Sequence, residues 1–383
     1  MIGFNLTEEQ KEMQAFFRKF SQERVKAAAE KMDEEEKMDM DLIHEMQSLG
    51  MFGIPFSEEV GGAGLDVFNY VLLMEELSKV DASTSITVSV HTSLCASSIE
   101  EFATPEQKEK WLRPLADGSK IGCFGLTEPG AGSDVAALQT TYKRENGKIY
   151  LNGTKTFITS SAGVKYLVIM AKNADDPEMF TEFFLDMSKP GVSLSPLHKL
   201  GLRMDSCCEV YMDNVELEEK DIFGKEGNGF SRGINDFNFE RWLVGASDYG
   251  MSIAVYEDAC RHANQRIAFG KPIGRQQLNQ LKVAEMAIKL KNMKNMLYET
   301  AWEADNNDGK FDPGAAAMCK YYCANSAFSV VDDGMQILAG VAVAGEHRAQ
   351  RIWRDLRVDR VSGGTDEMMI LTASKFELKK YRD

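Results

Sequence analysis

The sequence predicts an α+β protein in which an N-terminal helical domain, a middle antiparallel β domain and a C-terminal helical bundle follow one another along 383 residues. Three observations lead to this prediction. Helical periodicity runs to about residue 118, short β-rich segments occupy 120–223, and long helical patterns return after residue 229. Because strands and helices do not alternate, a doubly wound sheet is not expected. We place the domain boundaries at 1–119, 120–228 and 229–383.

Two helix-start signals mark the N-terminal region. Thr7–Gln10 has the pattern of a capping box, and Thr104–Gln107 repeats it with a proline at the first helical position. Between them, apolar residues recur at helical spacing over 42–49. The glycine-rich segment 61–64 has the composition of some phosphate-binding loops, but such segments are more often surface turns, and we interpret it as a turn.

The middle region has the pattern of a β domain. Its expected strands are Lys148–Leu151, Tyr166–Ala171, Glu182–Asp186 and Glu209–Met212. Turn signals at Asn146-Gly147, Asn152-Gly153 and Pro190-Gly191 divide them. Four long helices are then expected over 229–268, 276–305, 313–340 and 366–381.

Charge and cysteine content exclude several classes of function. The formal net charge of −15 repels phosphate backbones and anionic lipid, so neither nucleic acid nor a membrane is an expected partner. Apolar stretches are interrupted by charge before they reach the ~18–20 residues that a membrane helix needs. The seven cysteines are odd in number and no secretion signal precedes them, which favours the reducing cytoplasm.

Several common sites are missing from the sequence. The five histidines lie apart from one another and from any zinc-ligand spacing, so no metal is expected. Cys319 and Cys323 are four residues apart on an expected apolar helix, which indicates core packing. No G-x-G-x-x-G follows a strand, and neither a P-loop nor a G-x-S-x-G sequence occurs.

The most informative segment is Phe124–Asp134, FGLTEPGAGSD, in which glycines and hydroxyls follow a short strand and can converge on an acceptor-rich ligand. This string resembles the signature of the acyl-CoA dehydrogenases, flavoproteins with the same α, β, α order of domains. Gln265–Ile273 and Arg354–Glu367 resemble two further signatures of that family. The resemblance covers essentially the whole chain and implies an FAD enzyme.

The resemblance also implies which residues bind the cofactor. The flavin ring would be lined by Phe124, Leu126 and Thr127 and closed on its other side, near N5, by Phe157 and Thr159, while the flavin phosphates would lie near Gly132 and Ser133, with Ser133 also near the CoA arm. The FAD of a neighbouring subunit would be reached by Arg266 and Phe269. Its pyrophosphate would lie against Gln336 and Gly340, and its adenine near Thr365 and Glu367. An arginine suits a diphosphate because its planar fork makes paired, charge-assisted hydrogen bonds.

One departure from the family pattern bears on mechanism. Most members have a glutamate before the Gly-Thr of the third signature, as the base that removes the α proton, but here that position is Gly363, followed by Gly364. Phe237–Trp242 resembles the segment that supplies the base in the isovaleryl-CoA and long-chain enzymes, which implies Glu240 as the base. Its aromatic neighbours would desolvate the carboxyl and raise its pKa. Arg241 would help to position the CoA ligand, near Gly363 and Gly364.

The function implied is α,β-dehydrogenation of a short-chain acyl-CoA, or the reverse reduction of an enoyl-CoA. The β and C-terminal domains most resemble the branch of the family that acts on crotonobetainyl-CoA in carnitine metabolism, so a trimethylammonium acyl group is among the expected substrates. The resemblance further implies a homotetramer that exchanges electrons with electron-transferring flavoprotein. Two alternatives remain on the same fold: a non-catalytic CoA-binding homologue, and a flavin oxidase or monooxygenase.

Overall fold

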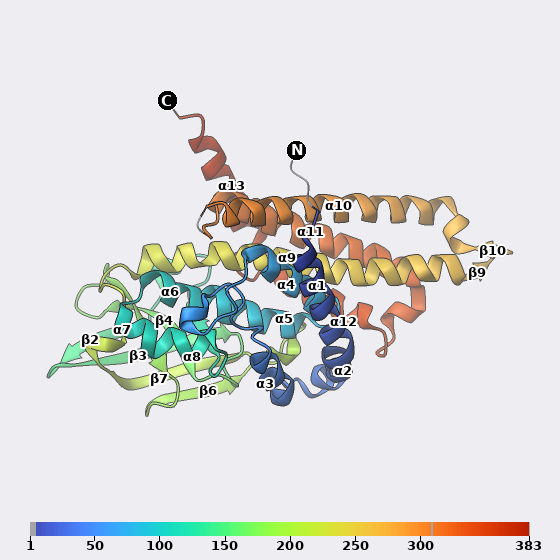
Figure 1. Cartoon of the computed structure of the whole chain (residues 1–383). Helices are drawn as coiled ribbons and strands as arrows, with labels where there is room; N and C mark the ends of the chain where they lie inside the picture. The colour runs from blue at the N-terminus through green and yellow to red at the C-terminus, as the bar shows by residue number, and fades with distance from the viewer. Residues whose placement is uncertain (1–4, 308, 383) are drawn as a thin grey trace.

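The computed structural model describes the main chain of residues 5–307 and 309–382, and the side chains of all of these except 231–236. Helices come first, a central sheet follows, and long helices close the chain, in the order that the sequence predicts. In Figure 1 the sheet lies at one end of the molecule, the N-terminal helices lie beside it, and α9 and α10 extend away from it to a small hairpin at the far end.

The N-terminal helices are α1 (Glu8–Phe20), α2 (Lys26–Glu35), α3 (Met40–Ser48), α4 (Val67–Ser78), α5 (Ala82–Ser89), α6 (Ser97–Phe102), α7 (Pro105–Gln107) and α8 (Arg113–Ala116). Both predicted capping boxes are confirmed. Thr7 caps α1 and Thr104 caps α7, and in each case the glutamine three residues on bonds back to the main chain of the threonine. The π-helical turn η3 (Val90–Ala96) continues α5 without a break.

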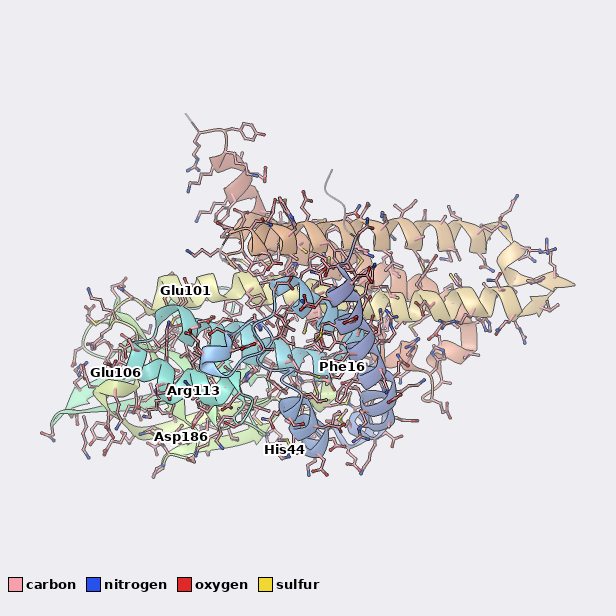
Figure 2. The ribbon with its side chains drawn as sticks, viewed as in Figure 1. Phe16, His44, Glu101, Glu106, Arg113 and Asp186 are labelled. Atoms are coloured by element: carbon pink, nitrogen blue, oxygen red, sulfur yellow. The ribbon has the colours of Figure 1, made fainter. Side chains whose placement is uncertain are left out.

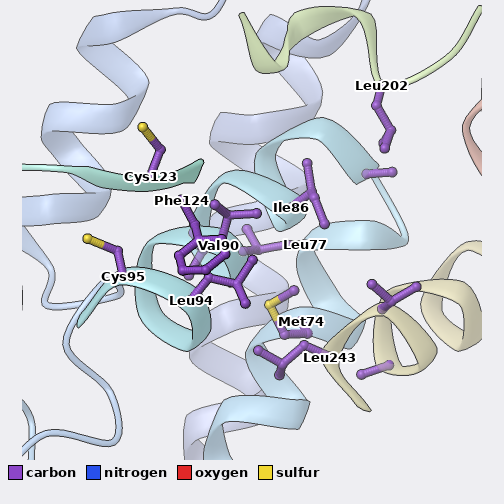
Figure 3. Packing of buried hydrophobic residues seen from close by; sticks show 14 of the residues in the cluster. Met74, Leu77, Ile86, Val90, Leu94, Cys95, Cys123, Phe124, Leu202 and Leu243 are labelled. Atoms are coloured by element: carbon purple, nitrogen blue, oxygen red, sulfur yellow. The ribbon is translucent and has the colours of Figure 1, made fainter. Parts of the chain in front are cut away.

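Helix α5 and η3 are buried although they are rich in serine and threonine. Local hydrogen bonds compensate part of that cost: Thr84 bonds to the capping residue Asp81, and the Thr87 hydroxyl donates to the carbonyl of Ser83 at 3.0 Å. Apolar positions of the same segment pack against strand β1 (Gly122–Gly125), and Figure 3 shows Val90, Leu94 and Phe124 together. This polar helix inside an apolar core supports the site described below.

The remaining strands of the sheet are β2 (Thr141–Glu145), β3 (Lys148–Ile158), β4 (Tyr166–Asn173), β5 (Phe180–Asp186), β6 (Val192–Pro196), β7 (Cys208–Leu217) and β8 (Ile222–Phe223). Their order is β6-β7-β3-β2-β4-β5-β8, and β1 pairs with β4. Most pairs are antiparallel as predicted, but β4 pairs in parallel with both β1 and β2. Parallel strands are joined by a long crossover connection and not by a tight turn, so no local turn motif in the sequence predicts such a pairing.

The turn predictions have mixed outcomes. Asn146 and Gly147 both have positive φ and join β2 to β3, and the turn at Pro190-Gly191 precedes β6. The turn predicted at Asn152-Gly153 is wrong, because this pair lies inside β3. The register against β7 shifts between Leu151 and Gly153, and a Cβ at Gly153 would come within 2.5 Å of the Thr140 hydroxyl. The glycine therefore serves a β-bulge and a close approach rather than a chain reversal.

The C-terminal helices are α9 (Gly229–Gln265), α10 (Gln277–Asp305), α11 (Pro313–Leu338), α12 (Arg348–Asp359) and α13 (Asp366–Lys379). The predicted ends at 268, 340 and 381 are slightly late. Strands β9 (Ile267–Ala268) and β10 (Lys271–Pro272) form the hairpin between α9 and α10. Helix α12 was not among the predicted helices, because its short apolar stripe lies in a strongly charged sequence.

Helix α11 and the turn after it, Pro313–Val343, are long and apolar enough to cross a membrane by length and composition alone. In the structure α11 packs along α9, α10 and α13, and the side chain of its Lys320 is completely buried in the protein. We therefore interpret α11 as the core helix of the C-terminal bundle.

Candidate active site

Glu240 lies on the part of α9 that packs against α5 and η3. Its side chain is buried, and its Oε2 accepts hydrogen bonds from the hydroxyls of Ser89 and Ser93, each at 2.6 Å. The hydroxyls of Ser85 and Ser247 meet 2.8 Å apart further along the same contact. Residue numbers rise along one helix as they fall along the other, so the two helices run antiparallel. A row of buried hydroxyls thus follows their contact and ends at the carboxyl of Glu240.

The environment of Glu240 suits a group that gains and loses a proton. Burial raises the pKa of its carboxyl to about 7, with a further increase from the negative charge of Asp359. The hydrogen bonds from Ser89 and Ser93 lower the pKa, because they stabilise the carboxylate, but they do not cancel the effect of burial. Both protonation states of such a carboxyl are populated near neutral pH, so it can act as a general base or acid.

The glycine turn of the third signature lies beside the helix that carries Glu240. Arg241 Nε donates to the carbonyl of Gly363 at 3.1 Å, and Lys320 Nζ donates to the carbonyl of Gly364 at 2.7 Å. The φ angles of the two glycines are +60° and +108°. A Cβ at position 363 would meet no heavy atom within 4 Å, so this position has space for a side chain. The structure therefore joins the turn at Gly363 to the residue that follows Glu240 on α9, and the exchange of the base stays a prediction.

Arg241 is a largely buried cation with neutral partners. Besides the carbonyl of Gly363, its guanidinium donates to Asn238 Oδ1 at 3.0 Å and lies 5.8 Å from the centre of the Phe237 ring. Burial lowers its pKa to about 10. A guanidinium held by neutral groups retains its attraction for an anionic or carbonyl oxygen. This placement agrees with a role for Arg241 in orienting a ligand.

The first signature forms one wall of the same region. Phe124 lies in β1, and its ring contacts that of Phe237 on α9 edge-on, with the ring centres 5.7 Å apart. Leu126 is buried and Thr127 is half-buried, and the amide of Thr156 in β3 donates to the carbonyl of Thr127 at 2.8 Å. The loop after β1 and strand β3 are thereby held side by side.

Phe157 and Thr159 follow on β3 and the turn after it. Phe157 has a φ of +58° and a side chain that is 63% exposed, which is unusual for a large aromatic residue in a sheet. Gly132 and Ser133 are exposed on the loop after β1, and a Cβ at Gly132 would meet no heavy atom within 4 Å. The residues of the first signature and of β3 therefore present an open surface with an uncovered aromatic ring.

A buried ion pair that the sequence reading missed fixes this loop. Lys155 Nζ donates to Glu128 Oε1 at 2.7 Å and to the carbonyl of Leu126 at 3.1 Å. Burial lowers the pKa of Lys155 to about 8, and the charge of Glu128 opposes the shift. The carboxylate also accepts the amides of Gln139 and Thr140. The sequence did contain an indication of this pair: Lys155 occupies an inward position in the alternating part of β3, and Glu128 belongs to the first signature.

The other predicted cofactor residues lie at the opposite end of the chain's long helices. Arg266 and Phe269 are exposed on the β9–β10 hairpin, and Phe269 is 96% exposed with a φ of +52°. Gln336 and Gly340 are exposed at the end of α11 and in the turn that follows. Figure 1 shows the hairpin at one end of the molecule and the sheet at the other, so a single chain does not unite these residues with Phe157.

Thr365 and Glu367 lie at the start of α13, next to the glycine turn. Thr365 is the N-cap of this helix and accepts a hydrogen bond from the amide of Met368 at 3.4 Å, while Glu367 is exposed in the first turn. The hydroxyl of Thr365 therefore already has a structural role.

Comparison with known proteins identifies the fold and its chemistry. The sequence matches the acyl-CoA dehydrogenase N-terminal domain over residues 7–119, the middle domain over 123–215 and the C-terminal domain over 227–377. Butyryl-CoA dehydrogenase from Megasphaera elsdenii is 32% identical, with a TM-score of 0.94 over 98% of this chain and 100% of that one. A chain in the structure of the electron transferring flavoprotein of Acidaminococcus fermentans is 34% identical, with a TM-score of 0.95 over 100% of both chains.

A third similar structure contains a reduced flavin. Glutaryl-CoA dehydrogenase from Mycobacterium smegmatis, in complex with FADH2, is 28% identical, with a TM-score of 0.92 over 98% of this chain and 97% of that one. The likeness to all three structures spans the helical domains and the sheet alike.

The raised pKa of Glu240 predicts a stability effect. Its carboxyl is protonated more readily in the folded chain than in the unfolded one, so the stability that this preference adds to the folded state is lost as the pH rises from about 4.5 to about 7. The difference between these two pKa values corresponds to about 3 kcal/mol in the free energy of unfolding. We expect Glu240→Gln, which carries no charge, to raise Tm by a few degrees at pH 8 and to change it little at pH 5.

Thermal unfolding of both proteins at the two pH values measures this effect. Glu178→Gln, which removes an exposed carboxylate, serves as the control and should leave Tm nearly unchanged at both. A Glu240→Gln protein with no gain at pH 8 relative to pH 5 would contradict the assigned environment of this carboxyl.

Proposed function

The chain belongs to the acyl-CoA dehydrogenase family, and from that premise we propose that it dehydrogenates a short, polar acyl-CoA between Cα and Cβ, or reduces the corresponding enoyl-CoA, with Glu240 as the base. Enzymes of this family are FAD-dependent oxidoreductases that act on CH–CH bonds of acyl-CoA substrates. The observation that carries the proposal is the buried, hydrogen-bonded carboxyl of Glu240, on the helix whose next residue, Arg241, donates to the carbonyl of Gly363. That carboxyl replaces the one missing from the third signature.

The protein's own groups account for the proton half of the reaction. In its ionised form Glu240 takes the α proton, and burial makes the carboxylate a stronger base than an exposed glutamate. Ser89 and Ser93 hold its Oε2 and limit its rotation. In the direction of reduction the protonated carboxyl returns the proton to Cα. Bound FAD supplies the hydride acceptor for Cβ, or the donor in the reverse direction.

The residues of the first signature and of β3 fit a flavin. An exposed aromatic ring, Phe157, stands next to a loop that the Lys155–Glu128 ion pair holds in place, and Gly132 leaves the main chain uncovered for phosphate. We assign Phe124, Leu126, Thr127 and Thr159 to the flavin ring side of this surface, and Ser133 to the phosphate side and to the CoA arm. Arg241, Gly363 and Gly364 would face the CoA thioester.

The rest of the cofactor site would come from a second copy. Arg266 and Phe269 lie on the β9–β10 hairpin, which Figure 1 shows at the end of the molecule opposite the sheet that carries Phe157. Gln336 at the end of α11 and Gly340 in the turn after it belong to the same proposed part of the site. Phe269 and its apolar neighbours on the hairpin and the start of α10 are uncovered, with Ile267 at 58%, Leu278 at 77% and Leu281 at 55% exposure. Covering such a surface stabilises association, so we propose a homotetramer in which each FAD contacts two subunits, with Thr365 and Glu367 near the adenine. The domain boundaries 1–119, 120–228 and 229–383 are part of the same proposal.

Partner and compartment follow from the same family context. The similarity to a chain in the structure of an electron transferring flavoprotein supports such a flavoprotein as the electron partner. All seven cysteines are free thiols, and six of them are buried, which fits a reducing compartment such as the cytoplasm.

The acyl group is proposed to be short and polar, of the crotonobetainyl-CoA and γ-butyrobetainyl-CoA type. The row of hydroxyls that ends at Glu240 supports a polar chain over a long alkyl chain. Aromatic faces support a cationic end, since a quaternary ammonium binds well against them. Tyr70 on α4 and Phe239 on α9 offer such faces, with their ring centres 5.8 Å apart.

Replacing Glu240 tests the base directly. We expect Glu240→Gln to retain FAD and to bind acyl-CoA, but to reduce its flavin about a hundredfold to ten-thousandfold more slowly than the wild type. Stopped-flow measurement of flavin bleaching under nitrogen gives this rate, and exchange of the α proton with solvent deuterium gives a second one. The exposed Glu178→Gln is the matched control. A near wild-type rate in Glu240→Gln would remove Glu240 from the mechanism.

Replacing Arg266 tests the shared cofactor site. Arg266→Ala should lose FAD during gel filtration more readily than the wild type while keeping its circular dichroism. Arg113→Ala is the control, because Arg113 is exposed near α8, at the end of the molecule away from the hairpin (Figure 2). Full FAD occupancy in a monomeric wild-type protein would overturn the two-subunit site.

An acyl-CoA panel tests the substrate and separates the alternatives. We expect crotonobetainyl-CoA or another short polar acyl-CoA to give the highest kcat/KM in an anaerobic assay run in both directions. A clear preference for palmitoyl-CoA would contradict the polar acyl group. Flavin that no acyl-CoA bleaches would indicate a non-catalytic homologue, and rapid hydrogen peroxide formation in air would indicate an oxidase.

A further inference from the structure

The buried ion pair of Lys155 and Glu128 joins two segments of the proposed flavin site. Lys155 lies on β3 and Glu128 on the loop after β1, and their exposures are 0% and 5%. The ammonium nitrogen and the nearer carboxylate oxygen are 2.7 Å apart. Replacing a buried pair of this kind by uncharged residues is often neutral for stability, so stability alone does not account for it.

On the loop side, the pair fixes the main chain at separate points of the first signature and of the segment after it. Lys155 Nζ donates to the carbonyl of Leu126 at 3.1 Å, and Glu128 Oε1 accepts the amide of Thr140 at 3.0 Å. Between these points the main chain of Glu128 closes a tight turn with Ala131, through bonds of 2.9 and 3.1 Å. The loop is therefore tied at its start and at its end to one buried ammonium group and its counter-ion.

On the strand side, β3 leaves its regular geometry directly after Lys155. Between the pairs Lys155–Val210 and Ile158–Cys208, β3 advances by three residues and β7 by two, which is a β-bulge. In an unbroken strand Phe157 would share the face of Lys155, since side chains repeat on every second residue. Instead, Lys155 is completely buried and the ring of Phe157 is 63% exposed. The bulge thus turns this ring out of the sheet.

Two successive residues of β3 hold two successive carbonyls of the loop. The side chain of Lys155 bonds to the carbonyl of Leu126, and the amide of Thr156 bonds to the carbonyl of Thr127 at 2.8 Å. Phe157 follows with a φ of +58°, which a bulky residue keeps only where the surrounding contacts determine it. These two contacts precede Phe157 directly, so the exposed ring and the loop share one anchor.

We propose that Lys155 and Glu128 are positioning residues for the flavin: the pair aligns the loop at Leu126 and Thr127 with the exposed ring of Phe157 before FAD binds, and the affinity for FAD depends on this alignment. A site that is ordered in advance binds more tightly, because less conformational entropy is lost on binding. The inference rests on the proposed flavin site. Both side chains of the pair are buried, so they act through the loop and the bulge.

The test compares FAD release from the wild-type holoprotein and from the double variant Lys155→Met with Glu128→Gln. This variant leaves no unpaired charge in the core, and its glutamine retains an oxygen for the amide of Thr140. It lacks the bond from β3 to the carbonyl of Leu126. Serial dilution followed by flavin fluorescence gives Kd, and visible circular dichroism reports the surroundings of the bound flavin. We expect Kd to rise by about tenfold or more, the equivalent of one charge-assisted hydrogen bond, and the dichroism to change.

Two control variants separate alignment from general effects. Lys148→Met with Glu216→Gln removes an ion pair between β3 and β7 with the same separation of 2.7 Å, but with side chains that are 51% and 49% exposed. Its Kd for FAD should equal that of the wild type. Val25→Ala truncates a completely buried side chain among the N-terminal helices, so it should lower Tm and leave Kd unchanged.

An unchanged Kd in the Lys155 and Glu128 double variant would overturn the proposal, and so would an equal loss of affinity in Val25→Ala. Phe157→Ala distinguishes this failure from a failure of the site. If Phe157→Ala weakens FAD binding and the double variant does not, the positioning role alone fails. If neither change affects Kd, the proposed flavin site fails.

Hydrogen–deuterium exchange of the wild-type protein tests the alignment without any variant. The amides of Thr140 and Thr156 are hydrogen-bonded to Glu128 and to the carbonyl of Thr127 in the chain without cofactor. Peptides that contain them should therefore be protected from exchange both before and after FAD is added. Free exchange at both amides until FAD binds would overturn the proposal, because the loop and the bulge would then be ordered by the cofactor and not by the ion pair.

Discussion

The site depends on one constraint, the burial of an acidic side chain where two polar-faced helices cross. Glu240 on α9 loses its hydration at the contact with α5 and η3, and two serine hydroxyls replace only part of it. The balance leaves a carboxyl with a pKa of about 7 rather than a permanently ionised or permanently neutral group. Several serines and threonines of α5 and η3 are tolerated in the core because helix carbonyls and facing hydroxyls satisfy them.

In this region Gly363 has no side chain, and the neighbouring helix α9 carries the carboxyl of Glu240. Gly363 lies at a positive φ, in a turn whose carbonyls are held by Arg241 and Lys320. The turn keeps its shape without a carboxylate, and the buried carboxyl of Glu240 lies on the helix whose Arg241 holds the turn. Because Arg241 follows Glu240 directly, one turn of α9 supplies both the acid and the cation that anchors the turn opposite.

The order of domains, the capped helices and the hairpin at Asn146-Gly147 could be predicted because each depends on local sequence. The bulge at Gly153, the parallel pairing of β4 with β1 and β2, and helix α12 could not. Gly153 looks like a turn residue, and only the close approach of Thr140 shows why the chain continues straight through it. Parallel pairing leaves no periodic mark that distinguishes it from antiparallel pairing.

The sequence by itself determined the family resemblance and the missing acid at position 363, and it predicted Glu240 as the replacement, because short motifs and their spacing carry that information. Only the tertiary structure decided what surrounds the acid. Ser89, Ser93 and Asp359 come from three separate elements, α5, η3 and α12, and no local pattern marks a serine or an aspartate as facing a particular carboxyl. Proton affinity depends on burial and on charges brought together by folding, so the chemistry of Glu240 is a property of the folded chain.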